Sequence, residues 1–317
     1  MDISHGWPKH CRSIGSENWK FCEPHTHDLV SGTCRSFGID SHMRCATPPL
    51  LAIAIVVSPC LSATIAMAQD ASAWDKGLHS AARLIAGAAN DAQRQAGVEI
   101  RLDPGWHTYW RDPGDSGVPP TFDFSGSENV KSVNVLWPAP MRFPDGDGGY
   151  SIGYTQSFIL PLQVVPKNTA HAPVVHLKLG YAVCEKLCVP ADANLTLHLA
   201  SSGKAASAIA KAEARVPRRT PIGVNTGLAI RSMRRDGSGR IVIDVAAPGG
   251  EAVDLFAEGP TPAWSLPLPE LVGTEPGVRR FAFKLDGLPP GAQTEGAALT
   301  LTAVSPDDAI EAVAHID

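Results

Sequence analysis

The stretch VVHLKLGYAVCEKLCVPADANLTLHL, residues 174–199, predicts two β-strands joined by a short turn. Apolar and polar residues alternate in VVHLKLGYAV and again in ANLTLHL, which is typical of strands with one buried face. Fully extended, residues 184–188 would separate the Cα atoms of Cys184 and Cys188 by about 13 Å, at ~3.3 Å per residue. Because a disulfide requires roughly 4.4–6.8 Å, a bond between them requires a sharp turn at 185–187, the end of a hairpin.

The composition favours an all-β chain with many turns. The 317 residues include 29 Gly and 27 Pro, and long helical patterns are scarce. The net charge is −5 and no long basic run is present, which argues against a nucleic-acid partner. Nucleotide-binding, serine-hydrolase and zinc-protease motifs are also missing from the sequence.

Short alternating segments fall into two groups, which predict two β-sandwich domains in tandem. The first occupies residues 69–200 and the second 222–317; between them, the Ala-rich and then basic segment 201–221 predicts a linker with a short helix. The expected strands are 80–86, 97–102, 130–137, 158–165, 174–183 and 193–199, then 227–233, 240–245, 253–257, 280–285 and 299–304.

Two segments of the first domain are expected to be loops. Residues 103–130 are dense in Trp, Pro and Gly, with Trp106, Tyr109 and Trp110 supplying apolar area over one end of the sandwich. Residues 138–150 are rich in Gly and Asp. A non-catalytic binding module would use the Trp-rich loop.

The N-terminal region predicts export. Residues 43–68 combine a positive start, an apolar centre and small residues before a cleavage point after Ala68, which is typical of a signal peptide; a membrane anchor is the alternative. We therefore expect a periplasmic protein whose true start is Met43, with residues 1–42 a disordered, non-native upstream extension. The set Cys11, Cys22, His25, His27 and Cys34 in that extension fits no standard zinc-finger spacing.

Removal of residues 1–68 would leave only Cys184 and Cys188, and an exported chain with two such cysteines is expected to join them. A structural staple over so short a loop would contribute about 2 kcal/mol, against ~4–5 for a loop of a hundred residues. A reversible redox pair and a soft-metal site for Cu(I) are the other interpretations. His176 and His198 are the nearby candidates to assist a metal.

Three motifs in the same order, GWHTYWRDPGDSGVPPTFDFSGS (105–127), WPAPMRF (137–143) and YAVCEKLCVPADANLTL (181–197), resemble the N-terminal periplasmic region of the DsbD/ScsB thiol–disulfide interchange proteins. The resemblance covers roughly residues 80–200 and is greatest to the ScsB-like branch, including its second sandwich. It implies immunoglobulin-like sandwiches and a reactive pair at Cys184 and Cys188, with a tighter turn than in well-known DsbD members.

The resemblance also implies a role. A thioredoxin-like domain or a membrane electron-transfer protein would donate electrons, and periplasmic proteins with disulfides would be the substrates. Active in this way, the protein would be a protein-disulfide reductase-type oxidoreductase that needs no cofactor or metal. An aromatic cap shields the pair in the family; Phe143 and Tyr150 are the candidates here, and Tyr181 is expected beside the pair. The family's membrane and thioredoxin-like domains are not found in this sequence, so we expect either that separate proteins supply them or that the chain is a free-standing module of altered role.

Overall fold

The computed structural model describes residues 69–317, apart from 90–91, 116, 145–148, 201–202 and 225–226. The predicted upstream extension (1–42) and signal peptide (43–68), with the cysteines and histidines considered there, lie outside the described residues. In the described part of the chain, no helix combines the length and the apolar character needed to cross a membrane.

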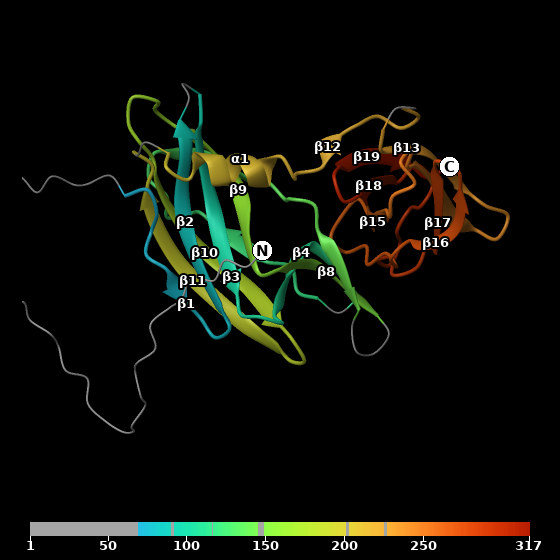
Figure 1. Ribbon diagram of the computed structural model, residues 1–317, viewed down its shortest axis with the longest axis horizontal. Helices are drawn as coiled ribbons and strands as arrows, with labels where there is room; N and C mark the ends of the chain where they lie inside the picture. Colours follow the sequence, from blue (N-terminus) through green and yellow to red (C-terminus); the bar gives the residue numbers. More distant parts are fainter. Residues whose placement is uncertain (1–68, 90–91, 116, 145–148, 201–202, 225–226) are drawn as a thin grey trace, which may run out of the picture. The chain divides into compact units, whose positions relative to one another are not determined.

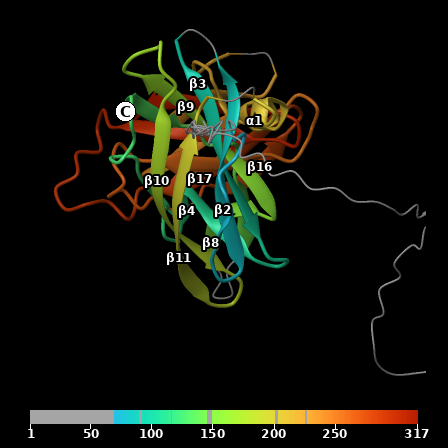
Figure 2. The same ribbon diagram turned by 90° about the vertical axis from the view of Figure 1, so that its left-hand side faces the viewer.

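The N-terminal half of the described chain forms two facing sheets, whose strands appear in Figures 1 and 2. In sheet order, the first sheet contains β1 (Asp75–Lys76), β2 (Ser80–Ala89), β3 (Arg94–Leu102), β9 (Ser157–Pro166) and β6 (Val130–Val135). The second contains β11 (Cys188–His198), β10 (Val174–Cys184), β4 (His107–Gly114), β8 (Tyr150–Thr155) and β7 (Met141–Pro144), with β5 (Thr121–Asp123) paired to β10.

Buried and exposed side chains alternate along the strands of this first sandwich, so that each sheet turns one apolar face toward the other. Along β11 the residues at alternate positions from Ala191 to Leu197 are buried, while those between them are exposed. They pack against alternating residues of the opposite sheet, such as Leu84 and Val98, in one continuous core. Burying one face of each sheet in this way removes apolar surface from water, which is the main stabilising contribution.

A second pair of sheets follows and has its own core. One sheet contains β12 (Arg218–Arg219), β19 (Ala309–His315), β18 (Ala298–Val304) and β15 (Asp254–Glu258). The other contains β13 (Ala229–Arg235), β14 (Arg240–Ala246), β17 (Val278–Lys284) and β16 (Glu270–Glu275). Their buried side chains, among them Ile243, Phe281 and Leu301, form a core of branched aliphatic and aromatic residues. The fold is all-β and immunoglobulin-like, as the sequence predicts.

The helix α1 (Ala206–Glu213) lies between the two pairs of sheets in the sequence and packs on the first. Its Ile209 is fully buried and reaches the backbone of Gly87 and Gly97, where a Cβ atom would come within 2.9 and 3.4 Å of the Ile209 side chain. The glycines of β2 and β3 therefore make the hollow that receives the helix.

Two loop predictions are wrong. Residues 103–130 contain β4 and β5, and residues 138–150 contain β7 and the start of β8. Strand β4 was hidden because it does not alternate: Thr108, Tyr109 and Trp110 are all buried, and a bulge follows Tyr109 in its pairing with β8. Trp110 is fully buried, with its ring centroid 5.9 Å from that of Phe256.

Next to Trp110, Arg111 makes an ionic contact with β15 and β19. Its guanidinium donates to both carboxylate oxygens of Glu258, at 2.9 and 2.7 Å, and to Glu311 at 2.6 Å. The adjacent Asp112 is half-buried, and burial together with the charge of Glu258 raises the pKa of its carboxyl group to about 6. This carboxylate is therefore held in a site that disfavours its charge.

Candidate functional site

The two cysteines close the long hairpin of β10 and β11. The strands pair without interruption from Val174↔His198 to Cys184↔Cys188. A disulfide joins Cys184 to Cys188, with their Cα atoms 4.2 Å apart, and residues 185–187 form the turn beyond it. The predicted hairpin and the predicted bond are both confirmed.

The two sulfurs occupy different environments. Cys184 is buried, with 3% of its surface exposed, in a small cluster with Tyr109 and Ala182. Cys188 is exposed, and Leu187 beside it is 78% exposed. A protein that approaches the tip of the hairpin therefore meets Cys188 first.

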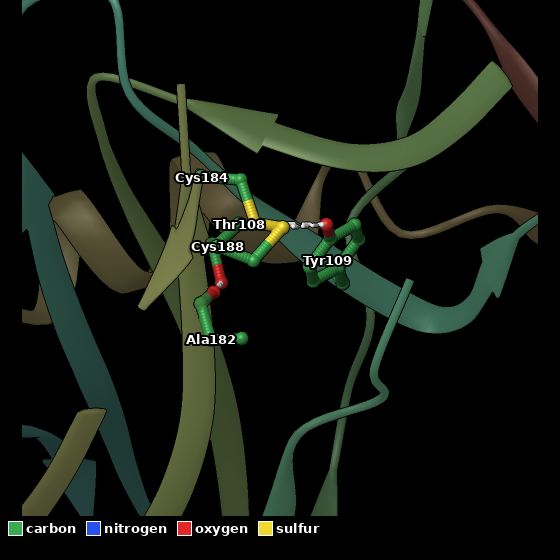
Figure 3. The surroundings of a disulfide bond; sticks show 5 residues. All are labelled: Thr108, Tyr109, Ala182, Cys184 and Cys188. Carbon is green, nitrogen blue, oxygen red and sulfur yellow. Dashed lines mark hydrogen bonds between the residues drawn. A yellow bond between two sulfur atoms is a disulfide. The ribbon is translucent and has the colours of Figure 1, made fainter. Parts of the chain in front are cut away.

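Tyr109 is the residue that contacts both sulfurs. Its hydroxyl oxygen lies 2.9 Å from Cys184 Sγ and 3.2 Å from Cys188 Sγ, and the side chain points directly at the disulfide (Figure 3). Disulfide sulfurs carry no proton, so the hydroxyl is the donor. Gly117 packs closely against the Tyr109 ring, since a Cβ atom at that position would come within 2.6 Å of it. Tyr109 was expected in a loop over one end of the sandwich, and no pattern in the sequence predicts this contact.

Strand β4 brings Tyr109 to the disulfide. It pairs with β10 only at the cysteine end, through Val183↔Thr108 and Cys184↔His107. The buried Thr108 hydroxyl donates to the carbonyl oxygen of Ala182 at 2.7 Å and fixes this junction (Figure 3). An unpaired hydroxyl here would cost free energy, so the bond specifies the register.

Tyr109 is part of an aromatic layer that joins β4 to β7. The His107 ring lies 5.7 Å from the Tyr109 ring, edge to face, and 5.1 Å from the Phe143 ring of β7, nearly parallel. Phe143 is thus placed one ring away from Tyr109, beside the residue that pairs with Cys184. The Tyr150 ring instead lies under the guanidinium of Arg142, 5.3 Å from its carbon, and is 39% exposed. Between Phe143 and Tyr150, residues 145–148 are outside the described part.

Tyr181 is buried on the same strand as Cys184, three residues earlier. Its hydroxyl forms a 2.8 Å hydrogen bond with Ser80 Oγ of the opposite sheet. Burial raises the pKa of Tyr181, which keeps the phenol neutral. These contacts give it a role in joining the two sheets.

The histidines considered as metal helpers lie far from the cysteines. His176 pairs across the hairpin with Thr196, and His198 with Val174. At ~3.3 Å per residue, His176 lies about 26 Å along β10 from Cys184, and its Nδ1 is 2.9 Å from Thr196 Oγ1. The suggestion that these histidines assist a metal at the cysteines is wrong, and within the described residues no three His, Cys, Asp or Glu side chains gather where they could hold one.

The comparisons with known proteins show what the first sandwich is similar to. The family model for "Thiol:disulfide interchange protein DsbD, N-terminal" matches residues 79–200, which is the segment that carries the disulfide hairpin and β4. The chain contains a DsbD/ScsB-like N-terminal region. The two cysteines and Tyr109 all lie within this DsbD-like region.

Solved structures extend the likeness beyond the DsbD-like region. The crystal structure of the N-terminal periplasmic domain of ScsB from Proteus mirabilis aligns with a TM-score of 0.63 at 20% identity, over 78% of this chain and 98% of that one. At that identity the match shows a shared fold. A titin structure, Titin-A168169, aligns at 8% identity over 73% of this chain and 92% of its own, but its TM-score of 0.15 is too low to indicate a common fold. A comparison with curated protein sequences gives no match.

Proposed function

We propose that the DsbD-like region passes electrons between proteins by reversible opening of the Cys184–Cys188 disulfide. The observation that carries the proposal is the asymmetry of the pair: Cys188 is exposed at the tip of a hairpin, whereas Cys184 is buried against the Tyr109 hydroxyl. Thiol–disulfide exchange requires one sulfur that a partner can reach and a good leaving group on the other.

In the reducing half of the cycle, a thiolate of a dithiol donor attacks Cys188 Sγ. The bond between Cys188 and Cys184 breaks, a mixed disulfide forms, and Cys184 leaves as a thiolate that accepts a hydrogen bond from Tyr109. The second donor thiolate then attacks the mixed disulfide and releases Cys188. The donor leaves oxidised, and the pair has gained two electrons and two protons.

The second half transfers the electrons to a substrate. The Cys188 thiolate attacks a substrate disulfide, one substrate sulfur leaves as a thiolate, and Cys184 resolves the mixed disulfide that results. The donor would be a thioredoxin-like domain or a membrane electron-transfer protein, and the substrates disulfide-containing proteins. The ScsB domain is periplasmic, which supports a periplasmic location for this protein as well. Export would be accompanied by removal of the signal peptide after Ala68. The chemistry needs no cofactor.

Phe143 is the better of the two proposed caps. Its ring stacks on His107 next to the pair, whereas the Tyr150 ring is held by Arg142. From that position the ring would hinder the approach of a small thiol to the disulfide until a partner docks, and so slow non-specific reduction. Replacing Phe143 with Ala should speed reduction by a small thiol, whereas Tyr150→Ala should leave the rate unchanged.

The two single cysteine variants test the proposal directly. With Cys184 replaced by Ser, Cys188 keeps its exposed thiol but loses its resolving partner, so mixed disulfides with donors and substrates should accumulate and be visible by mass spectrometry. Cys188→Ser is the matched control, since its remaining thiol is buried and should trap far less. Equal trapping by both variants, or none by either, would remove the support for this assignment.

A further inference from the structure

A cavity of about 390 Å³ lies between the DsbD-like region and the segment of α1, outside the contacts of the disulfide. It is bounded by the segment 138–141, by the end of β8 and the start of β9, and by the C-terminal turn of α1. This volume falls within the range of sites for small organic molecules, roughly 300–1,000 Å³.

The walls are largely apolar. Pro138, Pro140, Met141, Phe158 and Ile159 contribute side chains to them. Such a surface gains free energy when an apolar ligand displaces water from it.

Two hydroxyl groups in the walls are already engaged. The Tyr154 hydroxyl donates to the carbonyl oxygen of Pro138 at 2.8 Å, while its ring stacks on Phe158 with centroids 4.4 Å apart. The Thr155 hydroxyl donates to Met141 Sδ at 3.6 Å. The cavity therefore presents rings and methylene groups to an occupant.

The rim carries cations without matching anions. Lys211 and Arg215 of the helical segment line it, both exposed, and in the described part of the chain neither forms a salt bridge. The one carboxylate in the lining, Glu99, is paired with Arg83 at 2.7 Å and with Arg101 at 3.3 Å. The charges around the opening therefore sum to a positive value.

Two neighbouring features refine the choice of cation. Arg215 also lines a smaller cavity with Asp307 and Asp308, and these carboxylates compete with a ligand anion for its guanidinium group. Glu213 is directed to Gln95, whose Nε2 donates to it at 3.1 Å. Lys211 is left as the main cation for a ligand, and its flexible stem can follow a head group at the rim.

We propose that this cavity binds a small amphipathic organic anion, with its apolar body between Met141 and Phe158 and its anionic head at Lys211. Apolar walls alone would accept any hydrophobic molecule, so the positive charge of Lys211 is what selects a carboxylate or sulfonate. The proposal does not rest on thiol–disulfide exchange, since it uses none of the atoms at the disulfide.

Calorimetric titration of the full chain with decanoate tests it, with decanol as the uncharged control of the same length. Decanoate should bind saturably at one site, more tightly than decanol, and added salt should weaken it because the cation is exposed. Lys211→Glu should lower the affinity for decanoate roughly fivefold to tenfold and leave the affinity for decanol unchanged. Lys131→Glu, an exposed charge reversal on β6, should change neither.

A second variant fixes the location. Ala212 lines the cavity from α1 and is partly exposed, so Ala212→Trp would fill the space without disturbing a buried contact. Decanoate binding should then fall below detection. Unchanged binding by Ala212→Trp would place the ligand elsewhere and overturn the proposal. So would equal affinity for decanoate and decanol, or no saturable binding of decanoate by a chain that remains folded.

Discussion

The chain contains two comparable hairpins, and they are closed by different means. In the DsbD-like region, β10 and β11 pair as far as Cys184↔Cys188, where a disulfide ends the ladder. In the second sandwich, β18 and β19 pair as far as Val304↔Ala309. There the turn is held by hydrogen bonds: Ser305 N donates to the Asp308 carbonyl at 2.8 Å, and Asp308 N donates to Ser305 Oγ at 3.2 Å.

The difference shows that this fold can close a hairpin without a covalent link. A disulfide over so short a loop contributes only about 2 kcal/mol, and a turn with side-chain hydrogen bonds serves the same end in the second sandwich. The first hairpin also places one sulfur in solvent and buries the other against Tyr109. The small stabilisation expected from the bond and the asymmetry of its sulfurs are the two features that favour the proposed redox role over a structural one.

The largest expected effect comes from two glycines, one in each sandwich. A Cβ atom at Gly153 would lie 1.8 Å from the carbonyl oxygen of Thr108, and one at Gly287 would lie 1.8 Å from that of Ser265. Each Gly→Ala change should cost about 3–4 kcal/mol or more, because backbone must move. Only Gly153→Ala should also alter the rate at which dithiothreitol reduces the disulfide, since Thr108 positions β4. Denaturant unfolding measures the loss of stability, and thiol titration measures the rate of reduction. A changed reduction rate in Gly287→Ala would contradict the assigned difference between the two sandwiches.

Removing the disulfide makes the first hairpin resemble the second. The double variant Cys184→Ser, Cys188→Ser should lose about 2 kcal/mol of unfolding free energy and keep its β-sheet signal. Urea unfolding followed by circular dichroism gives both quantities. If the chain unfolds instead, the bond is a structural staple and the hairpins are not equivalent.

Asp112 provides a pH-dependent test of the contact between β4 and β15. Its pKa is raised from 3.8 to about 6 by burial and by Glu258, so the unfolded chain ionises first as the pH rises. The protonated carboxyl group therefore contributes its full stabilisation of the folded state below about pH 4. That contribution to the free energy of unfolding is lost as the pH rises from about 4 through 6. Asp112→Asn should be more stable than the parent by about 1–2 kcal/mol at pH 8 and equal to it near pH 3.5. Thermal unfolding at the two pH values checks this, with the exposed Asp192→Asn as a control that should show no difference.

The smallest effect concerns a single hydroxyl. Tyr109→Phe removes the hydrogen bonds to both sulfurs, worth about 1 kcal/mol, and should slow exchange with a dithiol roughly fivefold. Tyr154→Phe is the matched control, because it removes a buried hydroxyl whose partner is the carbonyl of Pro138. If Tyr154→Phe slows exchange as much as Tyr109→Phe, the contact with sulfur has no special role.

The sequence predicts the hairpin and its disulfide because two simple signals coincide there. Alternation from Val174 to Leu199 gives the strands, and the spacing of the cysteines gives the turn. The short helix between the sandwiches follows from an Ala-rich run bounded by proline. Each of these signals lies within a short stretch of sequence, so all of them can be recognised without knowledge of the tertiary structure.

Tyr109 was missed because its role depends on tertiary structure. Three consecutive residues of β4, Thr108 to Trp110, are buried, so the strand shows no alternation, and Pro113 and Gly114 follow closely, which is typical of a loop. Its pairing with β10 involves only two residue pairs, Val183↔Thr108 and Cys184↔His107. No periodic signal in the sequence records so short a contact between distant segments. The misplaced histidines, His176 and His198, reflect the same limit, since nearness in sequence put them too close to the cysteines.

The central claim is that the disulfide opens and closes while the sandwich stays folded. Equilibrating the protein with thiol–disulfide buffers of known potential, while thiols and circular dichroism are measured on the same samples, tests it most directly. We predict a reduction potential above about −300 mV and a β-sheet signal that is unchanged in the reduced protein. A potential well below that value, or loss of the sheet signal as the bond is reduced, would contradict the account.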